Sequence, residues 1–166
     1  MIAAVRGRAT ARLGRRVVLA ALVAGCAPRI AARGAAIGPP RDAGEALVMP
    51  DGARLPLRSW LPEGKVRGAI LGLHGFNDYA RAFALAAPLF TAAGWAVHAY
   101  DQRGFGAGPH PGIWPGHDAL AADAADAATL IRARHPGVPL VLLGESMGAA
   151  VLLVAATSPD PPPADA

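Results

Sequence analysis

The sequence of 166 residues contains one cysteine, Cys26, so an internal disulfide is excluded. Charged residues are also few. They make up 17% of the chain against 53% hydrophobic residues, a balance that excludes a disordered chain and predicts a packed core. No metal-ligand cluster, glycine-rich dinucleotide fingerprint or phosphate loop is present, so we expect no cofactor. Serine is rare too, with three in the chain, which limits the candidates for a nucleophile.

Acidic residues are absent before Asp42, and this absence accounts for the net charge of +4. Five of the 16 basic residues lie within residues 1–25, and the rest of the chain carries 11 basic residues against 12 acidic ones. The positive charge therefore indicates an N-terminal targeting signal rather than a basic binding surface. We expect no nucleic-acid partner.

Residues 1–26 have the three parts of an export signal: a cationic stretch, an apolar run over 17–23, and two small residues before Cys26. The run is too short to span a bilayer. The last five residues, LVAGC, resemble the bacterial lipobox, in which the cysteine carries the lipid. We therefore expect an exported lipoprotein, anchored to the membrane on the periplasmic side of the envelope; the alternative is a small buried cysteine. The pair Arg15-Arg16 fits a twin-arginine signal as well as a plain cationic region.

Residues 27–44 consist mainly of alanine, glycine, proline and arginine without periodicity, which predicts a flexible tether. The folded domain is expected over 45–166. It opens with two short extended stretches around Asp51-Gly52, a dipeptide typical of tight turns, so we predict a hairpin there.

Three continuous apolar runs follow, and their lack of alternation is typical of strands covered on both faces. Each run precedes a segment long enough for a helix, and this order implies right-handed crossovers and a parallel sheet. In such a sheet, ligands and reacting groups gather at the carboxyl ends of the strands. The runs are residues 69–73, 96–100 and 140–143.

The two segments between these runs differ in helical character. Residues 118–135 have apolar residues at helical spacing, aspartates toward the start and arginines at the end, which complement a helix dipole. Residues 79–93 contain Pro88, so we expect a helix that is kinked or begins late.

A G-x-S-x-G motif, residues 144–148, directly follows the third run and precedes a helix-compatible stretch. This is the context of a nucleophile elbow, in which a serine lies on a sharp turn between strand and helix and flanking glycines leave room for close packing. The alternative is a surface turn in a glycine-rich chain. We identify Ser146 as the candidate nucleophile.

Two further motifs accompany the elbow: Leu73-His74-Gly75-Phe76 after the first run, and YDQRGFG at 100–106 after the second. The three motifs together resemble the α/β-hydrolase family, most closely its monoacylglycerol lipase and lysophospholipase branch, over about 68–156. The resemblance implies an α/β-hydrolase fold, a mostly parallel sheet with helices on both faces, truncated here after the elbow helix.

The resemblance also implies roles for particular residues. The backbone N–H groups of Phe76 and Met147 would form the oxyanion hole, which stabilises the negative charge of an acyl-transfer intermediate. His74 would be structural, because in this family the catalytic histidine follows the serine in the chain. The loop at 101–106 would support the site. Trp114 could shape an acyl-binding wall or pack beside a turn.

These inferences lead to a serine hydrolase that cleaves carboxylic esters of lipids, of monoacylglycerol or lysophospholipid type, through an acyl-enzyme. An aminopeptidase or thioesterase on the same fold is an alternative, as is a truncated lipoprotein without catalysis. No histidine follows His135, so the order serine, acid, histidine is not completed. We therefore expect these 166 residues alone to be inactive, to fold poorly and to expose an edge of the third strand. The sequence does not predict an oligomeric state.

Overall fold

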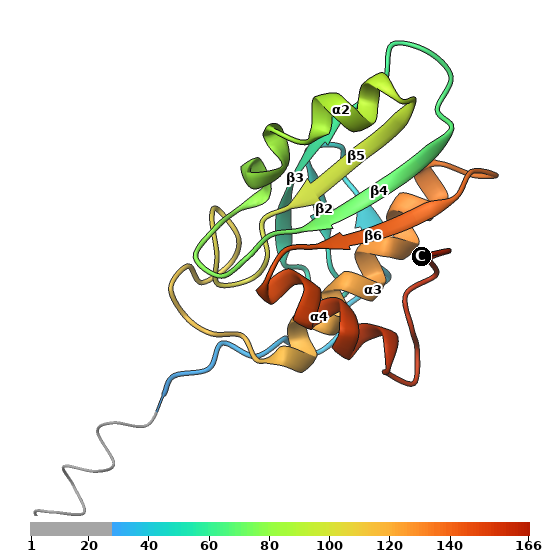
Figure 1. Ribbon diagram of the computed structural model, residues 1–166. Coiled ribbons are helices and arrows are strands. Elements are labelled where there is room, and N and C mark those ends of the chain that lie inside the picture. Colours follow the sequence, from blue (N-terminus) through green and yellow to red (C-terminus); the bar gives the residue numbers. More distant parts are fainter. Residues whose placement is uncertain (1–27) are drawn as a thin grey trace, which may run out of the picture.

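The computed structural model describes residues 28–166, so the predicted export signal and Cys26 lie outside the described residues. The described part forms one six-stranded mixed sheet with helices packed on it (Figure 1). The strand order is β1-β2-β3-β5-β4-β6. The strands are β1 (Arg41–Asp42), β2 (Ala46–Val48), β3 (Arg54–Trp60), β4 (Gly68–Leu73), β5 (Trp95–Tyr100) and β6 (Leu140–Gly144). The helices are the 3₁₀ helix η1 (Ala80–Ala84), α2 (Ala87–Ala92), α3 (His117–Arg134) and α4 (Met147–Ala156).

The three apolar runs form the parallel part of the sheet, as the sequence predicts. Strand β4 lies between β5 and β6 and pairs in parallel with both. Strands β2 and β3 form the predicted antiparallel hairpin, and β3 pairs antiparallel with β5. The carboxyl ends of β4, β5 and β6 therefore lie at one edge of the sheet, which we call the carboxyl edge.

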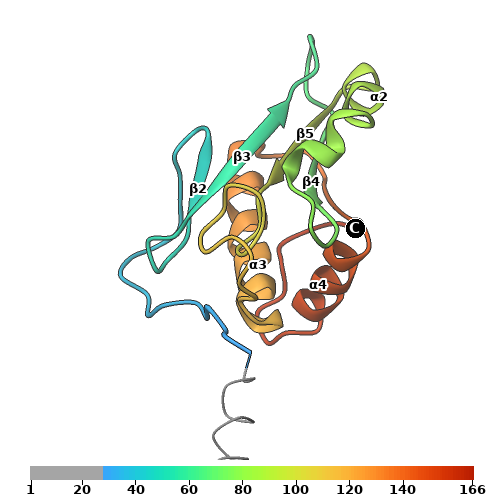
Figure 2. The same cartoon turned by 90° about the vertical axis from the view of Figure 1, so that its left-hand side faces the viewer.

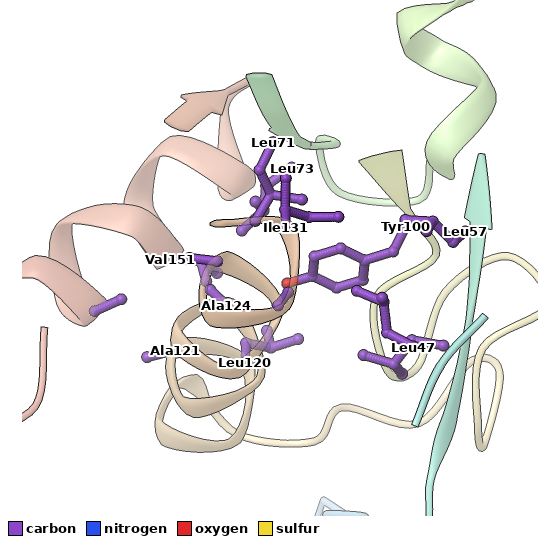
Figure 3. Packing of buried hydrophobic residues seen from close by; sticks show 14 of the residues in the cluster. Leu47, Leu57, Leu71, Leu73, Tyr100, Leu120, Ala121, Ala124, Ile131 and Val151 are labelled. Carbon is purple, nitrogen blue, oxygen red and sulfur yellow. The ribbon is translucent and has the colours of Figure 1, made fainter. Parts of the chain in front are cut away.

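Helices cover both faces of the parallel strands, because side chains along a strand alternate between faces. Leu71 and Leu73 of β4 belong to the buried cluster that includes residues of α3 and α4, whereas Ile70 packs with Ala87 of α2. Figure 2 shows α3 and α4 side by side, with α2 on the other side of the strands. Figure 3 shows the larger cluster, in which the ring of Tyr100 points toward α3.

The helices agree with the sequence pattern, including its interruption at Pro88. Helix α3 has Asp118 in its first turn and Arg132 and Arg134 in its last. The segment predicted to be kinked or late is divided into η1 and α2, and Pro88 lies in the first turn of α2. A proline is tolerated there because its missing N–H would have no helical acceptor. No helix within residues 28–166 is long and apolar enough to span a membrane.

The segment predicted to be a tether contacts the domain at several points. Ala31 N–H donates to the carbonyl oxygen of Trp114 at 3.0 Å, and Arg33 forms ion pairs with Asp123 and Asp126 of α3. Residues 41–42 form β1 on the edge of the hairpin. The sequence pattern showed no periodicity here because these contacts use single side chains and backbone groups rather than an apolar face.

The end of the chain lies along β6, although its prolines were expected to oppose a further strand. Leu142 N–H donates to Ala166 O at 2.7 Å, and Asp165 N–H donates to Leu140 O at 2.8 Å. The Asp165 carboxylate also accepts from Leu140 N–H and from Arg132. Part of the β6 edge that the sequence left open is therefore hydrogen-bonded to residues 165–166.

Candidate active site

Ser146 lies on a sharp turn between β6 and α4, at the carboxyl edge of the sheet. Its backbone has φ 49° and ψ −111°, a conformation that side chains with a Cβ rarely adopt. The residue is exposed to solvent. A strained, exposed serine between a strand and a helix N-terminus has the geometry of a nucleophile elbow.

The glycines of the motif are required by close packing around this turn. A Cβ on Gly148 would lie 2.1 Å from the carbonyl oxygen of Leu73, and one on Gly144 would lie 2.4 Å from the backbone nitrogen of Ala149. Both distances are far below van der Waals contact. Any larger residue would therefore push α4 away from β4 or from β6, and the turn would lose its shape.

The turn after β4 lies directly against the elbow. Glu145 N–H donates to Leu73 O at 3.0 Å, and a Cβ placed on Gly75 would lie 3.7 Å from Ser146 Cβ. Gly75, the residue before Phe76, therefore lies against Ser146, and Met147 follows Ser146 in the chain. Met147 begins α4, where the N–H groups have no intrahelical acceptor.

His74 is fixed as a structural residue by the hydrogen bonds of both ring nitrogens. Its Nδ1 lies 2.8 Å from Gly75 O, and its Nε2 accepts from Gln102 N–H at 3.1 Å, so Nδ1 carries the proton. Burial lowers the pKa of His74, which keeps the ring neutral. The side chain of Gln102 donates to His74 O at 2.9 Å and joins the two loops further. The interpretation of His74 as a loop-holding residue agrees with this geometry.

The loop after β5 supports the site through buried charges. Asp101 accepts from Ala80 N–H and Ala107 N–H, each at 2.8 Å, and so holds η1 and its own loop together. Arg103 binds Asp51 through two N–H groups, at 2.7 and 2.8 Å, and Asp123 at 2.5 and 3.1 Å. Burial lowers the pKa of Arg103, but its hydrogen bonds to the two carboxylates raise it by more.

The partners of Arg103 were not predicted from the sequence. Asp51 was interpreted only as part of a turn, and Asp123 only as a helix-dipole residue. The two carboxylates are 52 and 20 residues away from Arg103 along the chain. The available signal in the sequence was an arginine directly after an apolar strand. A buried arginine needs carboxylate partners, so acidic partners for Arg103 could have been expected, although not which ones.

A second polar cluster lies away from Ser146. His98 of β5 is fully buried, and its Nδ1 lies 2.7 Å from Ser59 Oγ while its Nε2 lies 2.7 Å from Nε2 of His135. Burial, together with the charges of His135 and Arg134, lowers the pKa of His98 to about 3. Neither ring is part of the elbow.

Within residues 28–166, no three His, Cys, Asp or Glu side chains lie close enough together to hold a metal ion. One hollow of about 680 Å³ is lined by residues 61–67 and 88–94, which precede β4 and β5 at the opposite edge of the sheet. This hollow is therefore not at the elbow of Ser146.

The comparison with protein families identifies the family of this chain. The family described as "Serine aminopeptidase, S33" matches residues 64–165, from before β4 to the end of the chain. The chain belongs to this family.

Relatives of this S33 chain include two lipases. It is 31% identical over 104 residues to a monoacylglycerol lipase of Mycolicibacterium smegmatis, covering 61% of this chain and 36% of that protein. It is 30% identical over 115 residues to a monoglyceride lipase of Mus musculus, covering 68% and 38%. The sequence-based identification of an α/β-hydrolase in the monoacylglycerol lipase branch is thus confirmed.

The fold of the S33 chain is shared with solved esterases. A carboxyl esterase from Bacillus coagulans has a TM-score of 0.58 at 24% identity, over 71% of this chain and 39% of the esterase. The predicted fold class is confirmed by this match. The chain spans little more than a third of the length of the two lipases, so the comparison covers the part of the fold up to and just beyond the elbow.

Proposed function

We propose that the protein is a serine hydrolase that cleaves carboxylic esters of lipids, of monoacylglycerol or lysophospholipid type, with Ser146 as its nucleophile. The strained and exposed backbone of Ser146 carries the proposal, because such strain persists only where the surrounding structure enforces it. The similarity to two monoacylglycerol lipases supports the substrate class.

In the proposed reaction, Ser146 Oγ attacks the ester carbonyl carbon while a histidine takes its proton. The N–H groups of Phe76 and Met147 donate to the developing oxyanion. The histidine then protonates the leaving alcohol, and water hydrolyses the acyl-enzyme to the free acid. The histidine cannot be His74, because both of its ring nitrogens are already engaged.

We further propose that residues 1–166 alone have no useful esterase activity. No histidine follows Ser146 in this sequence, and the family order requires the acid and the histidine after the serine. Without a base, the oxyanion hole and binding alone leave roughly 10³ to 10⁴-fold acceleration over water.

A fluorophosphonate probe tests the nucleophile, because it reacts only with an activated serine. The full-length gene product should be labelled at Ser146, and Ser146→Ala should abolish both labelling and hydrolysis of a monoacylglycerol. Ser158→Ala is the matched control and should keep both, since the Ser158 hydroxyl bonds the carbonyl oxygens of Ala155 and Asp160 just after α4. Labelling that survives in Ser146→Ala would show that another residue is the nucleophile.

Aminopeptidase activity is the second candidate, favoured by the description of the S33 family itself. The same serine would then attack an N-terminal amide. Comparing kcat/KM for a monoacylglycerol with that for an aminoacyl nitroanilide separates the two, since both reactions depend on Ser146. A higher value for the nitroanilide would replace the lipid esterase proposal.

We also propose that the protein is exported and held on the membrane by a lipid on Cys26. The signal-like sequence that ends at Cys26 supports this location. A diacylated cysteine buries enough methylene groups, at about 0.8 kcal/mol each, for stable anchoring. Mass spectrometry of membrane-extracted protein should show a chain that begins at acylated Cys26, and a mature chain that begins elsewhere would contradict the proposal.

A further inference from the structure

The carbonyl group of His74 lies where the turn after β4 meets the helix of the elbow. A Cβ placed on Gly148, in the first turn of α4, would lie 2.9 Å from His74 O, so the turn packs directly on the start of the helix. Gly75 comes next and lies against Ser146. Phe76, whose N–H is the proposed oxyanion donor, follows Gly75. A shift of His74 O would therefore be passed on to Phe76 N–H two residues later.

The side chain of Gln102 holds this carbonyl group from the loop after β5. Its Nε2 donates to His74 O at 2.9 Å, and both residues are fully buried. The loop itself is fixed, because Phe105 N–H donates to Gln102 O at 3.0 Å and the Asp101 carboxylate accepts from two backbone N–H groups. Figure 1 shows the loops after β4 and β5 at the end of the sheet where α4 begins. A fixed loop thus fastens the turn after β4.

Within residues 28–166, the amide of Gln102 uses its donor but not its acceptor. Its Oε1 is buried and has no hydrogen-bond partner there. A buried amide oxygen without a partner costs free energy, and an apolar side chain of similar length would fill the space without that cost. The backbone N–H of Gln102 already holds the ring of His74 through Nε2. What the side chain adds is the hydrogen bond to His74 O.

We propose that Gln102 is a positioning residue, which holds the oxyanion donor Phe76 N–H in place by binding the turn after β4 through His74 O. The inference rests on the proposed function, since it assumes an ester reaction at Ser146. Gln102 is fully buried, so it acts on the rate through the placement of the donor and not through contact with the substrate. Because this donor must be in place before charge develops, a displaced turn slows acylation without weakening substrate binding.

Gln102→Met tests this role in the full-length gene product, because methionine has a similar length and no donor. With a monoacylglycerol as substrate, kcat should fall about 10 to 100-fold and KM should be unchanged. The inhibition constant of a trifluoromethyl ketone should rise by the same factor, because its tetrahedral adduct with the serine binds the same N–H groups. Ser59→Ala is the matched control. It also removes a partner of a buried side chain, that of His98, but away from the elbow, so it should leave kcat per folded protein unchanged.

Gln102→Glu separates the hydrogen bond from the shape of the side chain. Its carboxyl group can donate to His74 O only while it is protonated, and burial favours the protonated form. The ratio of its kcat to that of the wild type should therefore fall about tenfold or more as pH rises through the pKa of the new carboxyl group. The ratio for Gln102→Met should not depend on pH. Taking the ratio removes the titration of the catalytic histidine, which all three proteins share.

The proposal would be overturned by a kcat of Gln102→Met equal to that of the wild type, or by an equal fall of kcat in Ser59→Ala. A ratio for Gln102→Glu that does not change with pH would also overturn it, and this measurement decides if Gln102→Met does not fold. Ser146→Ala in the same assay separates the two proposals. Loss of hydrolysis in Ser146→Ala, with full activity in Gln102→Met, contradicts the positioning role alone. Hydrolysis retained in Ser146→Ala contradicts the nucleophile and the positioning role with it.

Discussion

Replacing Ser146 by glycine should stabilise the fold while it destroys the nucleophile. The backbone at φ 49° and ψ −111° is unfavourable for any residue with a Cβ, at a cost of about 1–3 kcal/mol. Glycine avoids this cost but loses about 0.5–1 kcal/mol relative to alanine through the greater freedom of the unfolded chain. The difference leaves Ser146→Gly about 0.5–2 kcal/mol more stable than Ser146→Ala, which keeps the Cβ and lacks the hydroxyl.

Thermal or urea unfolding of the two variants measures this difference. For a chain of this size, 1 kcal/mol corresponds to about 2–4 °C in Tm, so the glycine variant should melt about 1–8 °C higher. Ser158 provides the control, because its φ is not positive and its side chain is not part of the elbow. There the glycine variant should be less stable than the alanine variant. If Ser146→Gly is no more stable than Ser146→Ala, the elbow stores no strain and the argument from backbone geometry fails.

Two further predictions concern buried polar groups. Arg103→Met should lower the free energy of unfolding, measured by urea titration, by about 3–5 kcal/mol, because it leaves Asp51 and the buried Asp123 without their partner. Arg58 is exposed, so the control Arg58→Met should change this free energy by less than about 0.5 kcal/mol. The pKa of His98 is about 3 in the folded protein and near 6.5 when unfolded, so the unfolded state binds more protons between these values. Stability should therefore fall as pH drops below about 6.5, by up to about 1.4 kcal/mol per pH unit from this group, and His98→Gln should remove that share of the slope.

The sequence by itself determined the elements whose signals are local. Three apolar runs, a dipole-matched helix and the interruption at Pro88 all depend on neighbouring residues, and the structure contains each of them. The elbow was predictable for the same reason, since the glycines around Ser146 serve contacts within a single strand-turn-helix unit and the strand beside it.

The tertiary structure decided which distant residues meet. Arg103 reaches Asp51, His98 reaches His135, and Arg33 reaches an aspartate 93 residues away, pairings that no spacing in the sequence encodes. Contacts of this kind also join Ala31 and Arg33, within the segment predicted to be a tether, to the domain. Residues 165 and 166 form hydrogen bonds with β6 although prolines precede them. Local propensity determines which helix or strand each segment can form. The packing of the whole chain determines which partners single charges and unpaired backbone groups meet, because buried polar groups need hydrogen-bond partners wherever the fold places them.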